Sequence, residues 1–94
     1  MQMIEHEQHG HRGAFFIEEE GTRLASLTYT VAGSRVILDH TDVGDALRGT
    51  GAGRKLVAAA VDWAREEQVK LMPLCPFARS VFDKTPEFGD VLAG

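Results

Sequence analysis

The chain has 94 residues, of which 44% are hydrophobic and 26% charged, so we expect one soluble globular domain spanning residues 1–94 with a modest core. Its formal net charge of −4 argues against a general affinity for nucleic acid or for an anionic membrane, because both call for a basic excess. The single cysteine suits a reducing compartment, no apolar run approaches the ~20 residues that span a bilayer, and residues 1–11 are polar, so we expect a cytoplasmic protein.

The first half of the chain predicts four strands separated by turns. The third strand is the clearest, because Leu27, Tyr29 and Val31 alternate with serine and threonine at the period of two that a sheet with unlike faces requires. A polar turn region is expected at residues 7–13, and glycines at 21 and 33 mark further turns. The expected strands are residues 3–6, 14–18, 24–31 and 36–43.

Three histidines, His6, His9 and His11, lie in or beside the first polar turn. Histidine is a common metal ligand, but no cysteine accompanies these three, and the nearby Glu5 and Glu7 are typical of surface residues. A metal site needs converging ligands with a supporting shell, so the pattern favours a solvated turn and we expect no metal.

The fourth expected strand leads, through a short link, into a glycine-rich turn. Gly49, Gly51 and Gly53 stand at alternate positions, and the apolar residues behind them recur at helical spacing to about Gln68. The first amides of a helix lack partners and carry the positive end of the helix dipole, and glycines remove the side chains that would block an anion. The turn is therefore predicted to hold a phosphate or pyrophosphate group.

The spacing within the turn narrows the choice of ligand. The ATP-type loop requires Gly-Lys-Ser/Thr. Here Gly53 is followed by Arg54 and only then by a lysine, and no serine or threonine follows to supply the metal-binding hydroxyl. The dinucleotide pattern G-x-G-x-x-G does not fit the turn either. The run Arg48-x-x-Gly51-x-Gly53 instead resembles the R/Q-x-x-G-x-G/A motif of the GNAT acyltransferase superfamily, whose turn holds the pyrophosphate of acetyl-coenzyme A. A glycine-rich turn without a ligand is the alternative.

The rest of the chain predicts one more strand and one more helix. Residues 69–74 form the expected fifth strand, which should lie parallel to the fourth because a helix connects the two. A second helix is expected from Pro76 to about Lys84, with Cys75 at its N-cap, because proline fits the first helical turn. Residues 89–94 are expected to form a tail, weakly anchored by Val91 and Leu92.

The order of these elements resembles a GNAT fold without the two helices that usually lie between its first strands. The expected fold class is α/β, more narrowly α+β, with a mixed five-stranded sheet in which an antiparallel meander precedes strand, turn, helix, strand and helix. Over residues 14–92 the chain is similar to a small subfamily of minimal, single-domain GNAT-like proteins. The pieces that carry this resemblance are His40-Thr41 with Val43, Leu47-Arg48-Gly49-Thr50-Gly51, Pro73-x-Cys75-Pro76-Phe77 and Pro86-Glu87-Phe88.

The resemblance implies an N-acetyltransferase that uses acetyl-coenzyme A (acetyl-CoA) as co-substrate, with an unidentified amine or peptide as acceptor. It implies that the pantetheine chain lies between the fourth and fifth strands, where the backbone from Thr41 to Val43 faces it like an added strand. The residues implied to hold the pyrophosphate are Arg48, Gly49, Thr50, Gly51, Ala52, Gly53 and Arg54.

Two residues are candidates for the chemistry. Cys75 occupies the position of the reactive thiol in the resemblance, and a helix N-terminus there would stabilise a thiolate that could accept an acyl group. A buried structural cysteine is the alternative. His40 is the second candidate, and the alternation of residues around it leaves open which face of the sheet it occupies.

One departure from the superfamily concerns the departing coenzyme. Many GNAT enzymes carry a tyrosine in the last helix that protonates the coenzyme A thiolate, whereas the tyrosine of this chain, Tyr29, lies in the third strand and Val81 and Phe82 occupy the helix. The acid would then have to be Cys75 or water. A non-catalytic coenzyme A-binding or protein-interaction module is therefore the alternative to an enzyme.

Overall fold

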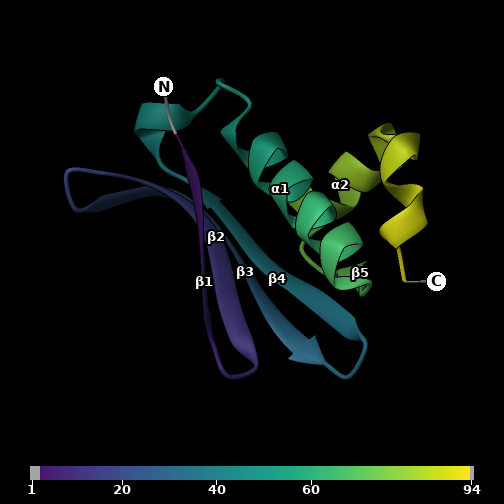
Figure 1. Ribbon diagram of the computed structural model, residues 1–94. Helices are drawn as coiled ribbons and strands as arrows, with labels where there is room; N and C mark the ends of the chain where they lie inside the picture. Colours follow the sequence, from purple (N-terminus) through teal and green to yellow (C-terminus); the bar gives the residue numbers. More distant parts are fainter. Residues whose placement is uncertain (1–2, 94) are drawn as a thin grey trace.

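A computed structural model describes residues 3–93, so Met1, Gln2 and Gly94 of the predicted domain lie outside the described residues. The elements are β1 (Ile4–His9), β2 (Arg12–Glu19), β3 (Thr22–Ala32), β4 (Arg35–Val43), the 3-10 helix η1 (Asp45–Leu47), α1 (Ala52–Glu67), β5 (Lys70–Pro73), α2 (Pro76–Lys84) and the 3-10 helix η2 (Pro86–Val91). The strands form a five-stranded sheet in the order β1-β2-β3-β4-β5 (Figure 1). This is the mixed α/β fold that the sequence predicts.

The first four strands form the expected antiparallel meander, but they are longer than predicted. β1 continues to His9, which pairs with Arg12, so the predicted polar turn over residues 7–13 is wrong. The chain reverses over Gly10 and His11 alone, and Gly10 has the positive φ of 64° that such a tight turn uses. Polar residues extend these strands because backbone pairing does not depend on an apolar side chain where one face of the sheet is open to solvent.

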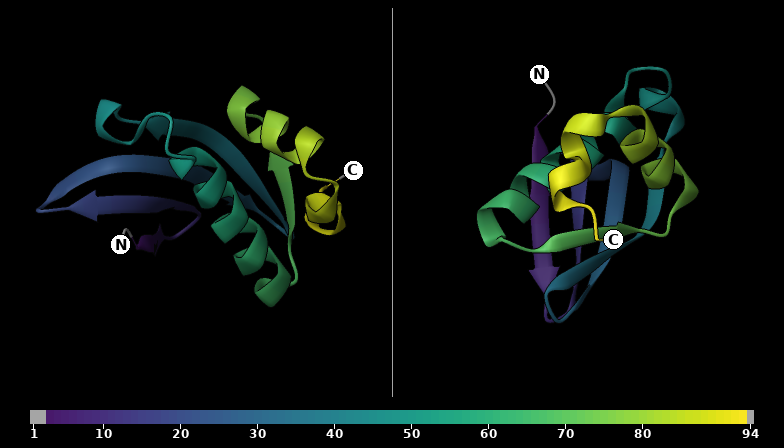
Figure 2. Two further views of the ribbon diagram at one scale, coloured as in Figure 1. Left: turned by 90° about the horizontal axis from the view of Figure 1, so that it is seen from above. Right: turned by 90° about the vertical axis from the view of Figure 1, so that its right-hand side faces the viewer.

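α1 packs its apolar stripe on the face of the sheet that carries Leu27, Tyr29 and Leu38, all of them at most 1% exposed. Ala60 and Ala64 in this stripe are fully buried, and their small side chains let the helix lie close to the strands. α2 contributes to the same core. Within residues 3–93 no helix covers the opposite face of the four-stranded meander, as Figures 1 and 2 show.

β4 and β5 separate part-way along their length. They pair in parallel, as predicted, but this pairing ends at Leu38 and Pro73, whereas β4 continues to Val43. The backbone N–H of Cys75 donates to the Leu38 carbonyl at 3.2 Å, so the chain turns from β5 into α2 at this point. Among the described residues, the edge of β4 that faced β5 therefore has no strand partner over residues 39–43.

The C-terminal segment is held against the core, although the sequence predicts a tail over residues 89–94. η2 buries Val91 to 3% exposure, and the N–H of Ala93 donates to the Leu71 carbonyl at 2.8 Å. The Arg65 guanidinium donates to the Asp90 carboxylate through two contacts, of 2.8 and 3.0 Å. Long-range contacts thus order a segment whose own sequence has no marked periodicity.

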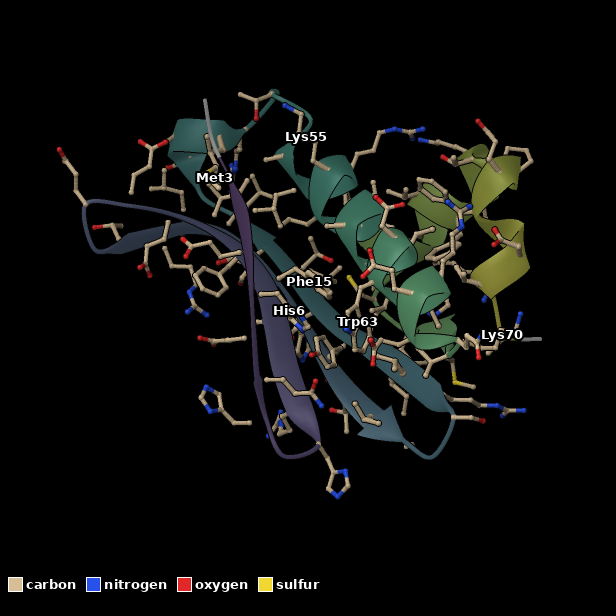
Figure 3. All side chains as sticks on the ribbon, in the orientation of Figure 1. Met3, His6, Phe15, Lys55, Trp63 and Lys70 are labelled. Carbon is tan, nitrogen blue, oxygen red and sulfur yellow. The ribbon has the colours of Figure 1, made fainter. Side chains whose placement is uncertain are left out.

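Among the described residues, the N-terminal histidines do not form a cluster that could hold a metal ion. His6 stacks on Phe15 with ring centroids 4.2 Å apart, and Trp63 of α1 lies beside them (Figure 3). Tyr29 completes this aromatic cluster, with its ring centroid 5.1 Å from that of Trp63. Among residues 3–93, no three histidine, cysteine, aspartate or glutamate side chains are arranged to hold a metal ion.

In the same part of the chain, no helix has both the length and the apolar character needed to cross a membrane.

Candidate functional site

The glycine turn starts α1 with a geometry that leaves the first helical amides free. Gly49 and Gly51 have φ angles of 77° and 81°, which glycine adopts without the strain that a side chain would cause. Gly51 is the N-cap of α1, has no side chain to bond the amides that follow, and accepts the first helical hydrogen bond, from Lys55, at 3.0 Å. A Cβ on Gly49 or Gly51 would meet no atom within 4 Å, so the turn opens onto space that an anion can fill.

Gly53 has a different role from the other two glycines. It lies inside α1 without a positive φ, and a Cβ on it would come within 2.7 Å of the Phe77 ring and 3.4 Å of Val43. Gly53 therefore lets an aromatic side chain of α2 pack against the first turn of α1. The alternating pattern of three glycines in the sequence does not distinguish this packing role from a place in the anion cradle.

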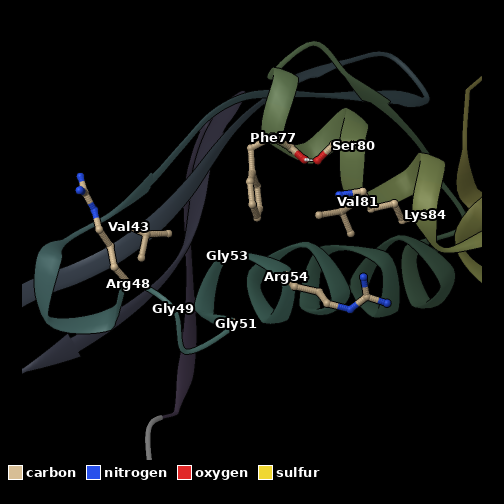
Figure 4. Close-up of a pocket in the computed structure, with 10 residues that line it drawn as sticks. All are labelled: Val43, Arg48, Gly49, Gly51, Gly53, Arg54, Phe77, Ser80, Val81 and Lys84. Atoms are coloured by element: carbon tan, nitrogen blue, oxygen red, sulfur yellow. Dashed lines mark hydrogen bonds between the residues drawn. The ribbon is translucent and has the colours of Figure 1, made fainter.

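A cavity of about 360 Å³ extends from the glycine turn between α1 and α2 (Figure 4). Val43, Phe77 and Val81 give it an apolar surface. The residues that line it are Val43, Arg48, Gly49, Gly51, Gly53, Arg54, Phe77, Ser80, Val81 and Lys84. The last four were missed from the sequence, although their spacing of three to four residues on α2 is the spacing of one helical face.

Three other residues of the predicted cradle have side chains that point elsewhere. The Thr50 hydroxyl lies against the Leu47 carbonyl, at 2.5 Å. The Ala52 side chain is buried in the core, at 2% exposure. Arg48 forms an exposed ion pair with Asp45 at 3.4 Å and points away from the centre of the cavity in Figure 4. Any contact that Ala52 makes with an anion in the turn would therefore come from the backbone, whereas the Thr50 N–H already donates to the Leu47 carbonyl at 3.2 Å.

Cys75 lies where β4 and β5 separate, at the N-cap of α2. Its Sγ is 3.3 Å from the Thr41 hydroxyl, and the residue is 7% exposed. Burial alone would raise the pKa of the thiol, but hydrogen bonds from the Thr41 side chain and from the backbone N–H groups of Ala78 and Phe77 outweigh it, and the resulting pKa lies below the ordinary value. The thiol is thus a buried group whose surroundings favour the thiolate.

Thr41 and Val43 lie on the same face of β4 as Cys75 and α1. Thr41 is paired with Leu27 and Val43 with Ala25, and both partners are buried under the helix. On its other edge, this part of β4 lies beyond the end of the pairing with β5. The structure thus brings Cys75, Thr41 and the backbone beside Val43 to one side of the gap between the two strands.

His40 does not join this group. It is paired with Thr28 on the helix-free face of the sheet, and its side chain is exposed there. Together with Glu7, His9 and Arg12 it lines a groove of about 380 Å³ on that face. The two predicted catalytic residues, His40 and Cys75, therefore lie on opposite faces of β4.

The sequence pattern of the GCN5-related N-acetyl-transferase family matches residues 14–91. The chain belongs to this family, whose members use acetyl-CoA, and its sheet, turn and helices are those of a GNAT fold.

Individual relatives are similar over different shares of their length. The solution structure of a GCN5-like protein from Staphylococcus aureus is 37% identical, has a TM-score of 0.73, and is matched over 96% of this chain and 88% of that one. Protein NATD1 of Gallus gallus is 36% identical over 63 residues, which are 66% of this chain but only 57% of that protein. The ribosomal-protein-alanine N-acetyltransferase of Brucella melitensis biovar Abortus 2308 shares the fold, with a TM-score of 0.68 at 18% identity, over 92% of this chain and 64% of that one.

Proposed function

We propose that this protein transfers the acetyl group of acetyl-CoA to an amine of a small molecule or a peptide. One observation carries the proposal. The uncapped first turn of α1, with left-handed Gly49 and Gly51, opens into a cavity that adjoins the gap between β4 and β5. We further propose that residues 1–94 act as one acyl-CoA-binding domain and that the protein works in the cytoplasm, where acetyl-CoA and reduced thiols are both present.

The residues of the turn fit a pyrophosphate. The space in front of Gly49 and Gly51 is free of atoms, so phosphate oxygens can approach the amides of residue 49 and of residues 51–54, where the helix dipole adds positive potential. The amide of Thr50 already donates to the Leu47 carbonyl at 3.2 Å. The side chain of Arg54 lines the cavity and adds positive charge near the turn, whereas Arg48 is paired with Asp45. Near Thr41 and Val43, the edge of β4 that β5 does not cover offers backbone hydrogen bonds to the amide groups of pantetheine, in the manner of an added strand.

Cys75 offers a two-step route for the acetyl group. The thiolate attacks the thioester carbonyl carbon, the bond from that carbon to the coenzyme sulfur breaks, and coenzyme A leaves as a thiolate that takes a proton from water. The acceptor amine then attacks the acetyl group on Cys75 Sγ, loses a proton to a base, and frees the Cys75 thiolate. The N-terminus of α2 and the Thr41 hydroxyl favour the negative charge on sulfur before and after these steps.

His40 is proposed as that base, acting from the helix-free side of β4. Its exposed side chain lies in the groove with Glu7 and His9, where a polar acceptor could be held. Because His40 and Cys75 are on opposite faces, His40 would not activate the thiol, and it would take the proton of the amine through a water at the edge of β4.

A non-catalytic coenzyme A-binding or interaction module is the second candidate, and one observation favours it. Tyr29 cannot supply the acid that many relatives place in the last helix, because it is 1% exposed and its ring packs 5.1 Å from that of Trp63. The described part of α2 carries Val81 and Phe82 where such a residue would be sought.

Two measurements test the proposal. Isothermal titration should show binding of acetyl-CoA and no comparable binding of ATP, and the reverse result would contradict it. A panel of amines and peptides should then contain at least one acceptor that releases coenzyme A faster than hydrolysis does. Good binding with no such acceptor would favour the module.

A further inference from the structure

Two cations face each other across the cavity, away from the glycine turn. Arg54 belongs to the first turn of α1 and Lys84 to the last turn of α2, and both line the cavity. Figure 4 shows their side chains on the two facing helices, on the side of the cavity opposite Arg48. The cavity therefore has a second cationic region besides the helix N-terminus.

Neither cation has a carboxylate partner among residues 3–93. By contrast, Arg48 in the same cavity pairs with Asp45, and Arg79 on α2 pairs with Asp83 at 3.7 Å. The position of Lys84 near the end of α2 complements the helix dipole, but that effect does not require the side chain to line a cavity opposite Arg54. In a chain with 14 acidic and 10 basic residues, two unpaired cations across one cavity indicate a site for an anion.

The surface between the two cationic regions is apolar. Val43, Phe77 and Val81 line the cavity there, and Phe77 is 41% exposed, so a flat ring could lie against its side chain. A ligand that matches this layout has a pyrophosphate, an aromatic base, and a second phosphate set apart from the first. Coenzyme A has these groups, and its 3′-phosphate carries roughly −1.5 to −2 charges at neutral pH.

We propose that Arg54 and Lys84 bind the 3′-phosphate of coenzyme A and make the cavity selective for coenzyme A over 3′-dephospho-coenzyme A. This inference rests on the proposed function, because it takes the pyrophosphate to lie in the glycine turn. The amide of Arg54 then serves the pyrophosphate while its side chain serves the 3′-phosphate. Lys84, which belongs to no motif of the sequence, becomes a residue that determines coenzyme specificity.

The experiment compares the dissociation constants of coenzyme A and 3′-dephospho-coenzyme A by isothermal titration. The native protein should bind coenzyme A about tenfold more tightly or better, the effect of one to two charge-assisted contacts in a partly exposed site. Lys84→Gln and Arg54→Gln should each lower this ratio toward one by weakening coenzyme A binding. Lys55→Gln makes the same change of charge on α1 outside the cavity lining and should keep the ratio.

The ratio separates the two phosphate sites. Loss of a pyrophosphate contact weakens both ligands equally and leaves the ratio unchanged, whereas loss of a 3′-phosphate contact weakens coenzyme A alone. Equal affinities in the native protein, or a ratio that survives both Lys84→Gln and Arg54→Gln, would overturn the inference and leave the proposed function standing. Binding of neither ligand would overturn both.

Discussion

Cys75 combines two properties that usually exclude each other. A buried thiol is normally held neutral because burial raises its pKa, yet Cys75 at 7% exposure has a lowered pKa. The difference comes from hydrogen bonds at the N-terminus of α2 and from Thr41 on β4. The pKa of this thiol is thus lowered by two elements, β4 and α2, that meet where β4 and β5 separate.

The lowered pKa predicts how Cys75 reacts as the pH changes. Because the thiolate is the reacting form, alkylation by iodoacetamide should persist to lower pH than it does for a free cysteine, and saturating acetyl-CoA should slow it by occupying the gap. Mass spectrometry of the alkylated peptide over pH 5–8 measures this. A slow alkylation rate that coenzyme does not change, and that declines as the pH is lowered in the same way as for a free thiol, would mean that Cys75 serves only in packing.

Substitution separates chemistry from packing at the same residue. Cys75→Ser keeps a hydroxyl that can bond Thr41 but removes the thiolate, so transfer should fall by at least tenfold while acetyl-CoA binding stays close to native. Cys75→Ala serves as the control for the lost hydrogen bond. Unchanged transfer in both variants would leave direct attack by the amine on acetyl-CoA as the route.

The residues show where sequence reasoning succeeds and where it stops. The N-cap position of Cys75 follows from Pro76, a local rule, and the structure has it there. The face occupied by His40 could not be read from alternation, because the β3–β4 register shifts between Thr28 and Tyr29 and this irregularity changes the phase of β4. Such a shift leaves no signature in the sequence of β4 itself.

At the scale of elements, the glycine turn gives a sharp test of the anion cradle. Gly51→Asp and Gly51→Asn both place a side chain at a φ of 81°, a region that Asp and Asn tolerate better than most residues, so the two variants should have similar stability. Only Asp adds negative charge against a pyrophosphate. Titration with acetyl-CoA should therefore show binding at least tenfold weaker in Gly51→Asp than in Gly51→Asn.

The paired design makes the outcome interpretable. Melting curves of the two variants check that any loss of binding does not come from unfolding. Equal affinity for acetyl-CoA in Gly51→Asp and Gly51→Asn would place the pyrophosphate somewhere other than the first turn of α1.

We expect the packing of η2 on the core to make a measurable contribution to the free energy of unfolding. Val91→Ala removes two buried carbons from a side chain that is 3% exposed, so the free energy of unfolding should fall by about 2 kcal/mol. Leu74→Ala, at a side chain 63% exposed, is the control and should change it by less than about 0.5 kcal/mol. Urea denaturation measures both, and an unaltered midpoint for Val91→Ala would mean that η2 does not pack on the core.

The sequence missed η2 for a physical reason. Its position depends on contacts from distant residues, such as the ion pair of Arg65 with Asp90, and not on an apolar period of its own. The strand, turn and helix before it were predictable because alternation, glycine placement and helical spacing are local. The α2 residues that line the cavity were only partly predictable. Their spacing shows that they share one face of the helix, but it does not show that this face lies opposite α1.

At the scale of the whole molecule, the two faces of the sheet differ in what covers them. α1 and α2 cover one face and enclose the core and the cavity, while no helix within residues 3–93 covers the other face of the meander (Figure 2). Beyond Leu38, the edge of β4 that faces away from β3 is not paired with β5, so a bound ligand can extend there from one face of the sheet to the other. In the proposed function, coenzyme A lies on the helix-covered face and the acceptor reaches it from the other face through this gap between β4 and β5.

The central claim is that acetyl-CoA binds between the glycine turn and the β4–β5 gap, and amide NMR tests it most directly on a protein of 10.3 kDa. Titration of the isotope-labelled protein with acetyl-CoA should shift the amide signals of residues 49–54 and 41–43 the most, because these backbone groups would bond the pyrophosphate and pantetheine. Signals of the open groove, such as Glu7 and Arg12, should move little. Saturable binding with its largest shifts in that groove, or no shifts in the turn, would contradict the account.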